Sequence, residues 1–183
     1  TSLNLKQYTY LMNMLSIAKQ KEQFLHFVTG GAGTGKSVLI RSIYQCLSRY
    51  YYRYVMHLKD TKDYKRIIIA AYTGMAAFNV NAVTLHSAFH LPIQGRAKKL
   101  NEDTLKQVRE EYKRLKLIII DEVSLVSSNK LFDINARLQQ VFNNDLLFGG
   151  ISVLLVGDFK QLQPVNENWI FQNTRNDVYT EIL

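Results

Sequence analysis

Residues 30–37 read Gly30-Gly31-Ala32-Gly33-Thr34-Gly35-Lys36-Ser37 and decide the fold, because they match the pattern G-x-x-x-x-G-K-[ST] directly after the apolar stretch 24–28. Glycines in such a loop let successive backbone N–H groups point inward at phosphate oxygens. The ammonium of Lys36 can reach the β- and γ-phosphates, and the Ser37 hydroxyl can ligate Mg²⁺. The sequence therefore predicts a nucleoside triphosphate site at residues 31–37. The alternative is a glycine-rich turn without a ligand.

Length and composition favour one domain with a full core, because the chain has 183 residues and is 47% hydrophobic. Its longest apolar runs are about half a dozen residues, far short of the ~20 that span a bilayer, so we expect no membrane association. The single cysteine excludes an internal disulfide, and the four histidines lack metal-ligand spacing. A formal charge of +8 suggests a polyanionic partner, and the alternative is a basic surface that serves only solubility.

Short apolar runs alternate with helical patterns along the chain. The predicted strands are 24–28, 67–72, 117–120 and 151–156, and each is apolar at nearly every position, as in a parallel sheet covered on both faces. The predicted helices are 5–20, 36–50, 103–115 and 129–142. This alternation predicts an α/β domain, with one parallel sheet and helices on both of its faces.

Polar or glycine residues follow every predicted strand, and ligands of open parallel sheets bind outside the carboxyl ends of the strands. Asp121 would hold Mg²⁺ together with Ser37, directly or through water. Glu122 could deprotonate the water that attacks the γ-phosphate, although an exposed acidic pair is the alternative. Gln161 could hydrogen-bond the γ-phosphate or this water, but its spacing alone favours a solvated loop glutamine.

Taken together, these segments resemble the 5′-to-3′ DNA helicases of superfamily 1, in the RecD-like branch, and are most similar to the petite-integration-frequency and Helitron helicases. The resemblance rests on the phosphate loop and on residues 71–77, 83–89, 121–126 and 157–162. It implies a P-loop NTPase (RecA-like) fold that fills residues 1–183 as a single ATPase domain, with a possible small insertion at about 92–116. Because the chain starts at Thr1 rather than Met, we expect it to be a piece of a longer protein. A second RecA-like domain beyond Leu183 would then supply the arginine finger.

The resemblance also assigns roles to single residues. Gln161 becomes the γ-phosphate sensor, and Gln7 matches the glutamine that reads the adenine edge, where a solvated helix glutamine is the alternative. The implied DNA contacts are Thr73, Gly74, Thr84, His86 and Phe89. Hydroxyls and glycine backbone suit sugar-phosphate contacts, and an aromatic ring can stack on an unpaired base. Core packing is the alternative for Phe89, and a helix N-terminal hydrogen bond is the alternative for His86. The basic segment 96–116 is either a DNA contact or a solvated helix face.

The sequence therefore predicts the motor domain of an ATP-dependent DNA helicase that uses ATP and Mg²⁺. Lys36, Glu122 and Gln161 would be its catalytic residues, and single-stranded DNA or DNA forks its partners. Two alternatives remain, namely a nucleotide-gated DNA-binding module without turnover and a small-molecule kinase that uses the same loop. The expected location is the nucleus, or else the mitochondrion, and the oligomeric state stays open.

Overall fold

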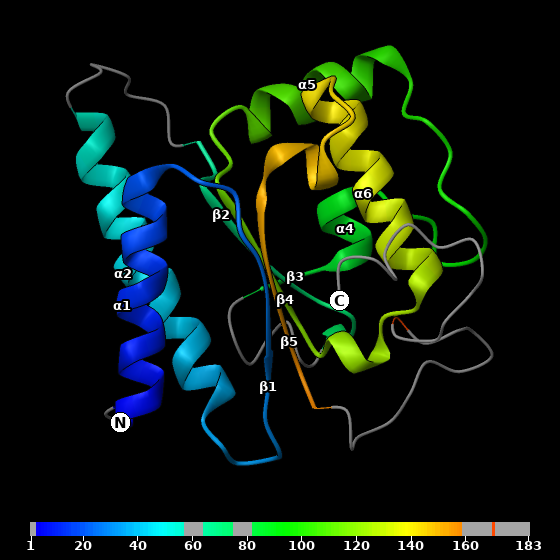
Figure 1. The fold of residues 1–183 in the computed structure, drawn as a ribbon. Coiled ribbons are helices and arrows are strands. Elements are labelled where there is room, and N and C mark those ends of the chain that lie inside the picture. Colours follow the sequence, from blue (N-terminus) through cyan, green and yellow to red (C-terminus); the bar gives the residue numbers. More distant parts are fainter. Residues whose placement is uncertain (1–2, 57–63, 75–81, 159–169, 171–183) are drawn as a thin grey trace.

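The computed structural model describes residues 3–56, 64–74, 82–158 and 170 (Figure 1). Its strands are β1 (Leu25–Thr29), β2 (Ile67–Ala71), β3 (Val83–Thr84), β4 (Leu117–Asp121) and β5 (Ser152–Gly157). Its α-helices are α1 (Leu5–Gln20), α2 (Lys36–Met56), α4 (Leu85–Phe89), α5 (Glu102–Tyr112) and α6 (Ser128–Phe142). Two short 3₁₀ helices, η1 (Val123–Leu125) and η2 (Leu147–Gly150), complete the described elements.

The strands form one sheet in the order β1-β5-β4-β2-β3, and every described pairing is parallel. All four predicted strands are present, with ends within a residue of those expected. The predicted helix 5–20 has the predicted ends, whereas α2 continues well past Tyr50 to Met56. The sequence reasoning missed β3 and α4, which lie inside the segment assigned to DNA binding.

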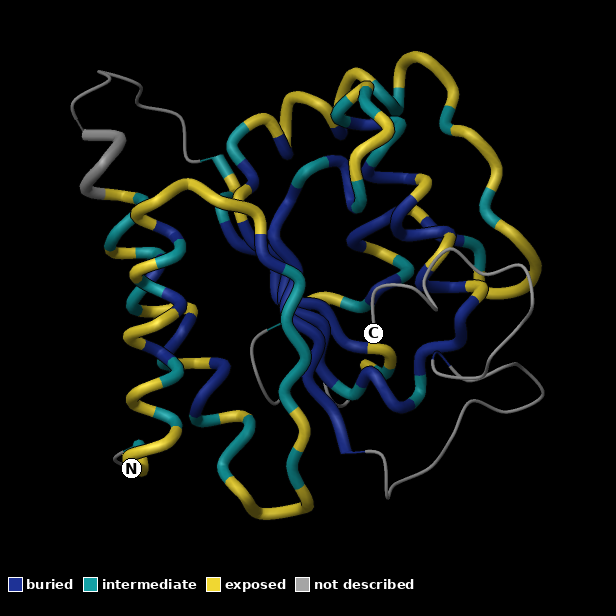
Figure 2. Tube along the Cα trace, in the orientation of Figure 1, coloured by how far each residue is buried: buried dark blue, intermediate teal, exposed yellow. Residues whose placement is uncertain are grey.

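Helices cover both faces of the sheet, as predicted. In Figure 1, α1 and α2 lie on one face and α4, α5 and α6 on the other. Alternate strand residues face opposite sides, so Ile118 and Ile120 pack in the core beneath α6 while Leu117 and Ile119 pack beneath α1 and α2. Burial on both faces explains why the central strands are apolar at every position, and Figure 2 shows these strands as buried.

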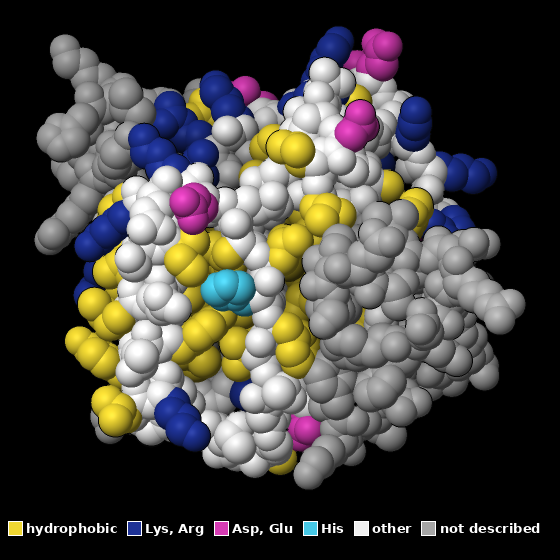
Figure 3. Space-filling model, in the orientation of Figure 1, with side chains coloured by type: hydrophobic (Ala, Val, Ile, Leu, Met, Phe, Trp, Pro, Cys, Tyr) yellow, Lys and Arg dark blue, Asp and Glu magenta, His cyan; other side chains and the backbone are white. Residues whose placement is uncertain are grey.

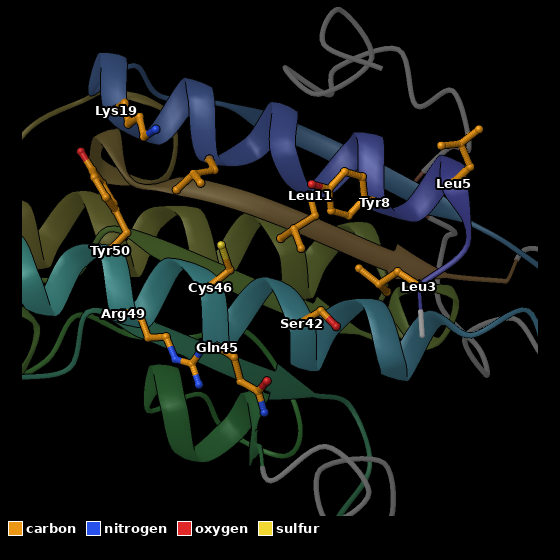
Figure 4. Close-up of a pocket in the computed structure, with 11 residues that line it drawn as sticks. Leu3, Leu5, Tyr8, Leu11, Lys19, Ser42, Gln45, Cys46, Arg49 and Tyr50 are labelled. Carbon is orange, nitrogen blue, oxygen red and sulfur yellow. The ribbon is translucent and has the colours of Figure 1, made fainter. Parts of the chain in front are cut away.

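β1 is an edge strand of the described sheet, and residues 25–28 are only half-buried. Apolar side chains accordingly reach the surface around β1 and α1, where they gather near the centre of Figure 3. A second apolar surface is the groove of about 920 Å³ between α1 and α2, which Leu3, Leu11 and Cys46 help to line (Figure 4). Among the described helices, none has the length and hydropathy to span a bilayer.

Hydrogen bonds and an ion pair hold residues 89–98, which precede α5, against α6. Arg96 forms an ion pair with the buried Asp133, with Nε and Oδ1 2.9 Å apart, and Asp133 also accepts from the backbone N–H of Ala97 at 3.0 Å. Arg137, only 4% exposed, donates to the carbonyls of Phe89 (3.0 Å), His90 (3.2 Å) and Lys98 (2.9 Å). These bonds make residues 89–98 part of the domain's packed structure and give Arg96 a structural role.

Candidate nucleotide and DNA site

The phosphate loop joins the end of β1 to the start of α2. Its first residue, Gly30, donates its N–H to the carbonyl of Gly157 at the end of β5 (3.3 Å), which fixes the loop to the neighbouring strand. Gly33 and Gly35 have φ of 73° and 87°, a backbone conformation that residues other than glycine rarely adopt. The loop therefore needs glycine at these positions and lies at the carboxyl edge of the sheet, as predicted.

Lys36 lies folded over the loop. Its Nζ donates to the carbonyl of Gly30 at 2.6 Å and to that of Gly31 at 2.9 Å. The ammonium group is thus held where a loop of this type receives phosphate. To bind phosphate oxygens, Lys36 must exchange at least part of these two bonds for them.

Gln7 lies beside the phosphate loop, although it is 27 residues from Thr34 in sequence. Its Nε2 donates to the carbonyl of Thr34 at 3.0 Å, and its Oε1 accepts from the backbone N–H of Asn4 at 3.1 Å. Asn4 in turn accepts from the N–H of Gln7, which completes a capping box at the start of α1. Gln7 is therefore not a solvated helix glutamine, and its role in reading adenine stays a prediction.

Asp121 and Glu122 lie at the carboxyl end of β4, at the same edge of the sheet as the loop. Asp121 is only 8% exposed, and Oδ1 accepts the N–H of Glu122 at 2.9 Å. Burial raises the pKa of Asp121, and the charge of Glu122 adds to this rise. The hydrogen bond from the N–H of Glu122 and the charge of Lys36 partly oppose it. Because β1 and β4 lie parallel on either side of β5, the phosphate loop after β1 and Asp121 at the end of β4 lie at the same edge of the sheet.

Glu122 has a left-handed backbone, with φ of 54°. Thr73 Oγ1, which follows β2, donates to Glu122 Oε2 at 3.1 Å. The sequence predicts that Thr73 contacts DNA and that Glu122 acts on ATP, but it does not indicate a contact between these two side chains. The link depends on the β2–β4 register, which sets Ala71 opposite Asp121.

The residues predicted to hold Mg²⁺ suit that ion. Mg²⁺ at a nucleotide is bound by one or two protein oxygens together with phosphates and waters. Ser37, in the first turn of α2, and Asp121 offer a hydroxyl and a carboxylate of this kind. The described residues contain no group of three or more His, Cys, Asp or Glu side chains that could hold a metal ion.

Among the predicted DNA contacts, Thr73 and Gly74 follow β2, Thr84 is the last residue of β3, and His86 lies in α4 directly after it. Thr84 caps α4, because its Oγ1 accepts from the N–H of Ser87 at 3.3 Å. His86 is half-buried, and its Nε2 is buried without a hydrogen-bond partner among the described residues. Burial, and to a lesser extent the charge of Lys130, lowers the pKa of His86, which favours the neutral ring.

The prediction that Phe89 stacks on a base is wrong. Its side chain is 0% exposed and packs in the core with residues of α5 and α6, including Val108 and Ile134. The apolar residues of α4, namely Leu85, Ala88 and Phe89, are all buried, and α4 contacts β2, β3 and α6. The alternative given for Phe89, core packing, is what the structure shows. Gln161 and residues 75–77 lie outside the described residues.

Comparisons with known proteins agree with this geometry. The family model for PIF1-like helicases matches residues 2–178. The chain is 38% identical to the ATP-dependent DNA helicase PIF1 of Emericella nidulans over 85% of this chain and 20% of that protein.

Solved structures are also similar. The Candida albicans Pif1 helicase matches with a TM-score of 0.73 and 30% identity over 95% of this chain and 37% of that chain. The Bacteroides Pif1 helicase in complex with ADP-AlF3 and single-stranded DNA matches with a TM-score of 0.65 and 27% identity over 100% of this chain and 36% of that one.

This chain thus spans between a fifth and two-fifths of the length of these relatives. The match covers almost all of the chain and includes the phosphate loop, the acidic pair and the predicted DNA segment. The chain belongs to the PIF1-like helicase family, and its fold is that of the family's RecA-like domain.

Proposed function

We propose that this chain is the first RecA-like motor domain of an ATP-dependent DNA helicase that moves 5′ to 3′ along single-stranded DNA. The carrying observation is that one edge of the sheet brings together the phosphate loop, Asp121 and Glu122. Lys36 is already held within this loop by two carbonyls. Family membership and the ADP-AlF3 and DNA complexes of related proteins support the proposal.

In this proposal, the loop N–H groups and Lys36 bind the β- and γ-phosphates and balance the charge that develops on the γ-phosphoryl group. Ser37 and Asp121 would hold Mg²⁺, which when bound would neutralise phosphate charge. Glu122 orients the attacking water and accepts its proton. The raised pKa of Asp121 suits a role as a ligand, because a bound cation would offset the cost of its buried charge.

Thr73 connects the proposed DNA-binding segment to the proposed ATP site. It heads the segment assigned to DNA and holds Glu122 by a hydrogen bond at 3.1 Å. DNA would lie along Thr73, Gly74, Thr84 and His86, at the same carboxyl edge as the nucleotide. A second RecA-like domain beyond Leu183 would complete the cleft and supply the arginine finger, a group typically worth ~10³–10⁵ in turnover. A nuclear or mitochondrial location stays a prediction.

The test is DNA-stimulated phosphate release by the full-length protein. Lys36→Ala should weaken nucleotide binding and abolish turnover, because it removes the charge on the phosphates. Glu122→Gln should retain nucleotide affinity, since the glutamine amide can still accept from Thr73, but should lose turnover. Lys19→Ala and Glu22→Gln change exposed residues away from the loop and serve as matched controls.

Equal loss of nucleotide affinity in Lys36→Ala and Glu122→Gln would contradict these roles. Nucleotide-dependent DNA binding without phosphate release would favour the gated binding module, and phosphate transfer to a metabolite would favour the kinase.

A further inference from the structure

An exposed aromatic side chain lies beside the predicted DNA contacts. Tyr72 directly follows β2 and directly precedes Thr73 and Gly74, so it lies at the carboxyl edge of the sheet, where ligands of such sheets bind. Tyr72 is 36% exposed, whereas Phe89 is 0% exposed. Among the described residues of the segment 72–89, Tyr72 is therefore the tyrosine or phenylalanine whose ring a ligand can reach.

The alternation of β2 determines on which side of the sheet Tyr72 lies. Ile68 and Ala70 pack in the core beneath α4 and α6, and Tyr72, two residues beyond Ala70, continues this series. The structure agrees with the alternation, because the Tyr72 ring contacts the ring of His86 in α4, with the two ring centroids 6.1 Å apart. Tyr72 and His86 therefore lie together, on the side of the sheet that α4 covers.

The contact with His86 supports the Tyr72 ring and leaves part of it open. The planes of the two rings are tilted by 60°, and tilted rings at this separation attract each other. His86 is half-buried in α4, so the helix sets its position. The tilt leaves no parallel slot between the two rings in which a planar base could be inserted. A base would instead stack on the face of Tyr72 that His86 does not cover.

Tyr72 lacks the hydrogen bond by which other tyrosines of this domain are fixed. The hydroxyl of Tyr112 donates to the carbonyl of Ala88 in the core, and the hydroxyl of Tyr10 is bonded to Nδ1 of His26. None of the described residues forms a hydrogen bond with the hydroxyl of Tyr72. The described contact of its side chain is thus the ring of His86, itself a predicted DNA contact.

We propose that Tyr72 is the residue on which an unpaired base of the bound strand stacks. The proposal rests on the proposed function, because it places this base in the DNA path described there. Every base has an aromatic face, so stacking on a ring binds a single strand at any sequence, as a motor that moves along DNA requires. Thr73 and Gly74, the next residues in the chain, lie where contacts to the sugar-phosphate backbone are predicted. Tyr72 thus has the stacking role that the sequence assigned to Phe89.

The experiment compares two labelled oligonucleotides by fluorescence anisotropy, with the full-length, nucleotide-free protein. One is oligo(dT), and the other has the same length but consists only of abasic nucleotides, so that it keeps the phosphates and lacks the bases. Tyr72→Leu should weaken binding of oligo(dT) about fivefold or more. It should leave the affinity for the abasic strand unchanged, whereas a merely structural role of Tyr72 would lower both affinities alike.

Two further variants complete the test. Tyr72→Phe should bind oligo(dT) as the wild-type protein does, because it keeps the ring. Tyr52→Leu is the matched control and should bind both strands normally, because Tyr52 is 58% exposed on α2, outside the proposed DNA path. The log–log salt slope should be the same in Tyr72→Leu and the wild-type protein, since stacking releases no counterions.

The outcomes separate this proposal from the proposed function. Tight binding of oligo(dT) by the wild-type protein and by Tyr72→Leu alike would overturn the stacking proposal alone, and so would an equal loss of affinity for the two strands. Failure of the wild-type protein to bind either strand would contradict the proposed function and the stacking proposal together.

Discussion

Replacing Arg137 by leucine should destabilise the domain strongly, because this one side chain holds residues 89–98 against α6. Its guanidinium donates to three backbone carbonyls, of Phe89, His90 and Lys98, and to Gln140 Oε1 at 2.7 Å. Arg137 is 4% exposed, so the acceptors that it leaves gain little access to water. Burial lowers the pKa of Arg137, and the charge of Asp133 partly offsets this.

The expected loss is about 3 kcal/mol in the free energy of unfolding. A buried acceptor left without its donor costs roughly 1–3 kcal/mol, and three carbonyls at the low end of that range reach this value. Leucine recovers some apolar packing and removes a costly buried charge, which argues against the high end. The loss lies within the range measured when one partner of a buried polar network is removed.

Urea unfolding at pH 7 measures this effect, with Arg109→Leu as the matched control. Arg109 also donates to two backbone carbonyls, those of Gln140 and Val141, both at 3.0 Å, but its side chain is exposed. The control should therefore lose less than about 1 kcal/mol. Amide hydrogen exchange in Arg137→Leu should rise first at Ala97 and Leu100, whose N–H groups are bonded to α6 side chains. Equal losses in the two variants, or unchanged exchange at these amides, would refute the reasoning.

Three further predictions follow from the site and the core. Burial raises the pKa of Asp121, so its charged form costs stability at any pH above that pKa. Asp121→Asn should therefore raise the Tm of the nucleotide-free protein at pH 7 and remove the extra stabilisation by Mg²⁺-nucleotide. Calorimetry measures both effects, and a lower Tm of the nucleotide-free variant would contradict the prediction. Gly35→Ala should weaken nucleotide binding more than Gly33→Ala, because both have positive φ but only a Cβ at Gly35 would collide with Gln7 Nε2, at 2.9 Å; equal effects in a titration with a fluorescent nucleotide would rule out the collision. Phe89→Ala should cost about 3–5 kcal/mol in urea unfolding, whereas Phe89→Leu should cost much less and leave the affinity of the folded protein for single-stranded DNA unchanged; a large loss of affinity in Phe89→Leu would return this residue to the DNA path.

The fold class could be predicted from the sequence because every signal for it is local. The helix 5–20 and the central strands carry their own apolar periodicity, and the glycine loop marks the turn between β1 and α2. β3 has only two residues, and they pair with Ala70 and Ala71. So short an element has no periodicity to detect and exists because β2 offers it a partner edge.

The site was predictable to the extent that strand ends meet at one edge. The burial of Phe89 could not be predicted, because burial of a residue on a five-residue helix depends on which distant elements cover it. The hydrogen bonds between Gln7 and Asn4 could have been predicted, because these two residues have the spacing of a capping box at the start of a helix. The contact between Thr73 and Glu122 depends on sheet register, which motifs do not report.

The strand order also bears on how the domain folds. β1 pairs with β5, so Phe24 bonds to Ser152 across 128 residues of chain. Parallel contacts of such sequence separation form late, because the entropy of closing a long loop must be overcome before they contribute. Synthesis proceeds from the amino terminus, so the ribosome must release nearly all of this segment before β1 can find its partner. The phosphate loop lies early in the sequence, yet β5, the strand that holds it, is among the last parts of the sheet that can be assembled.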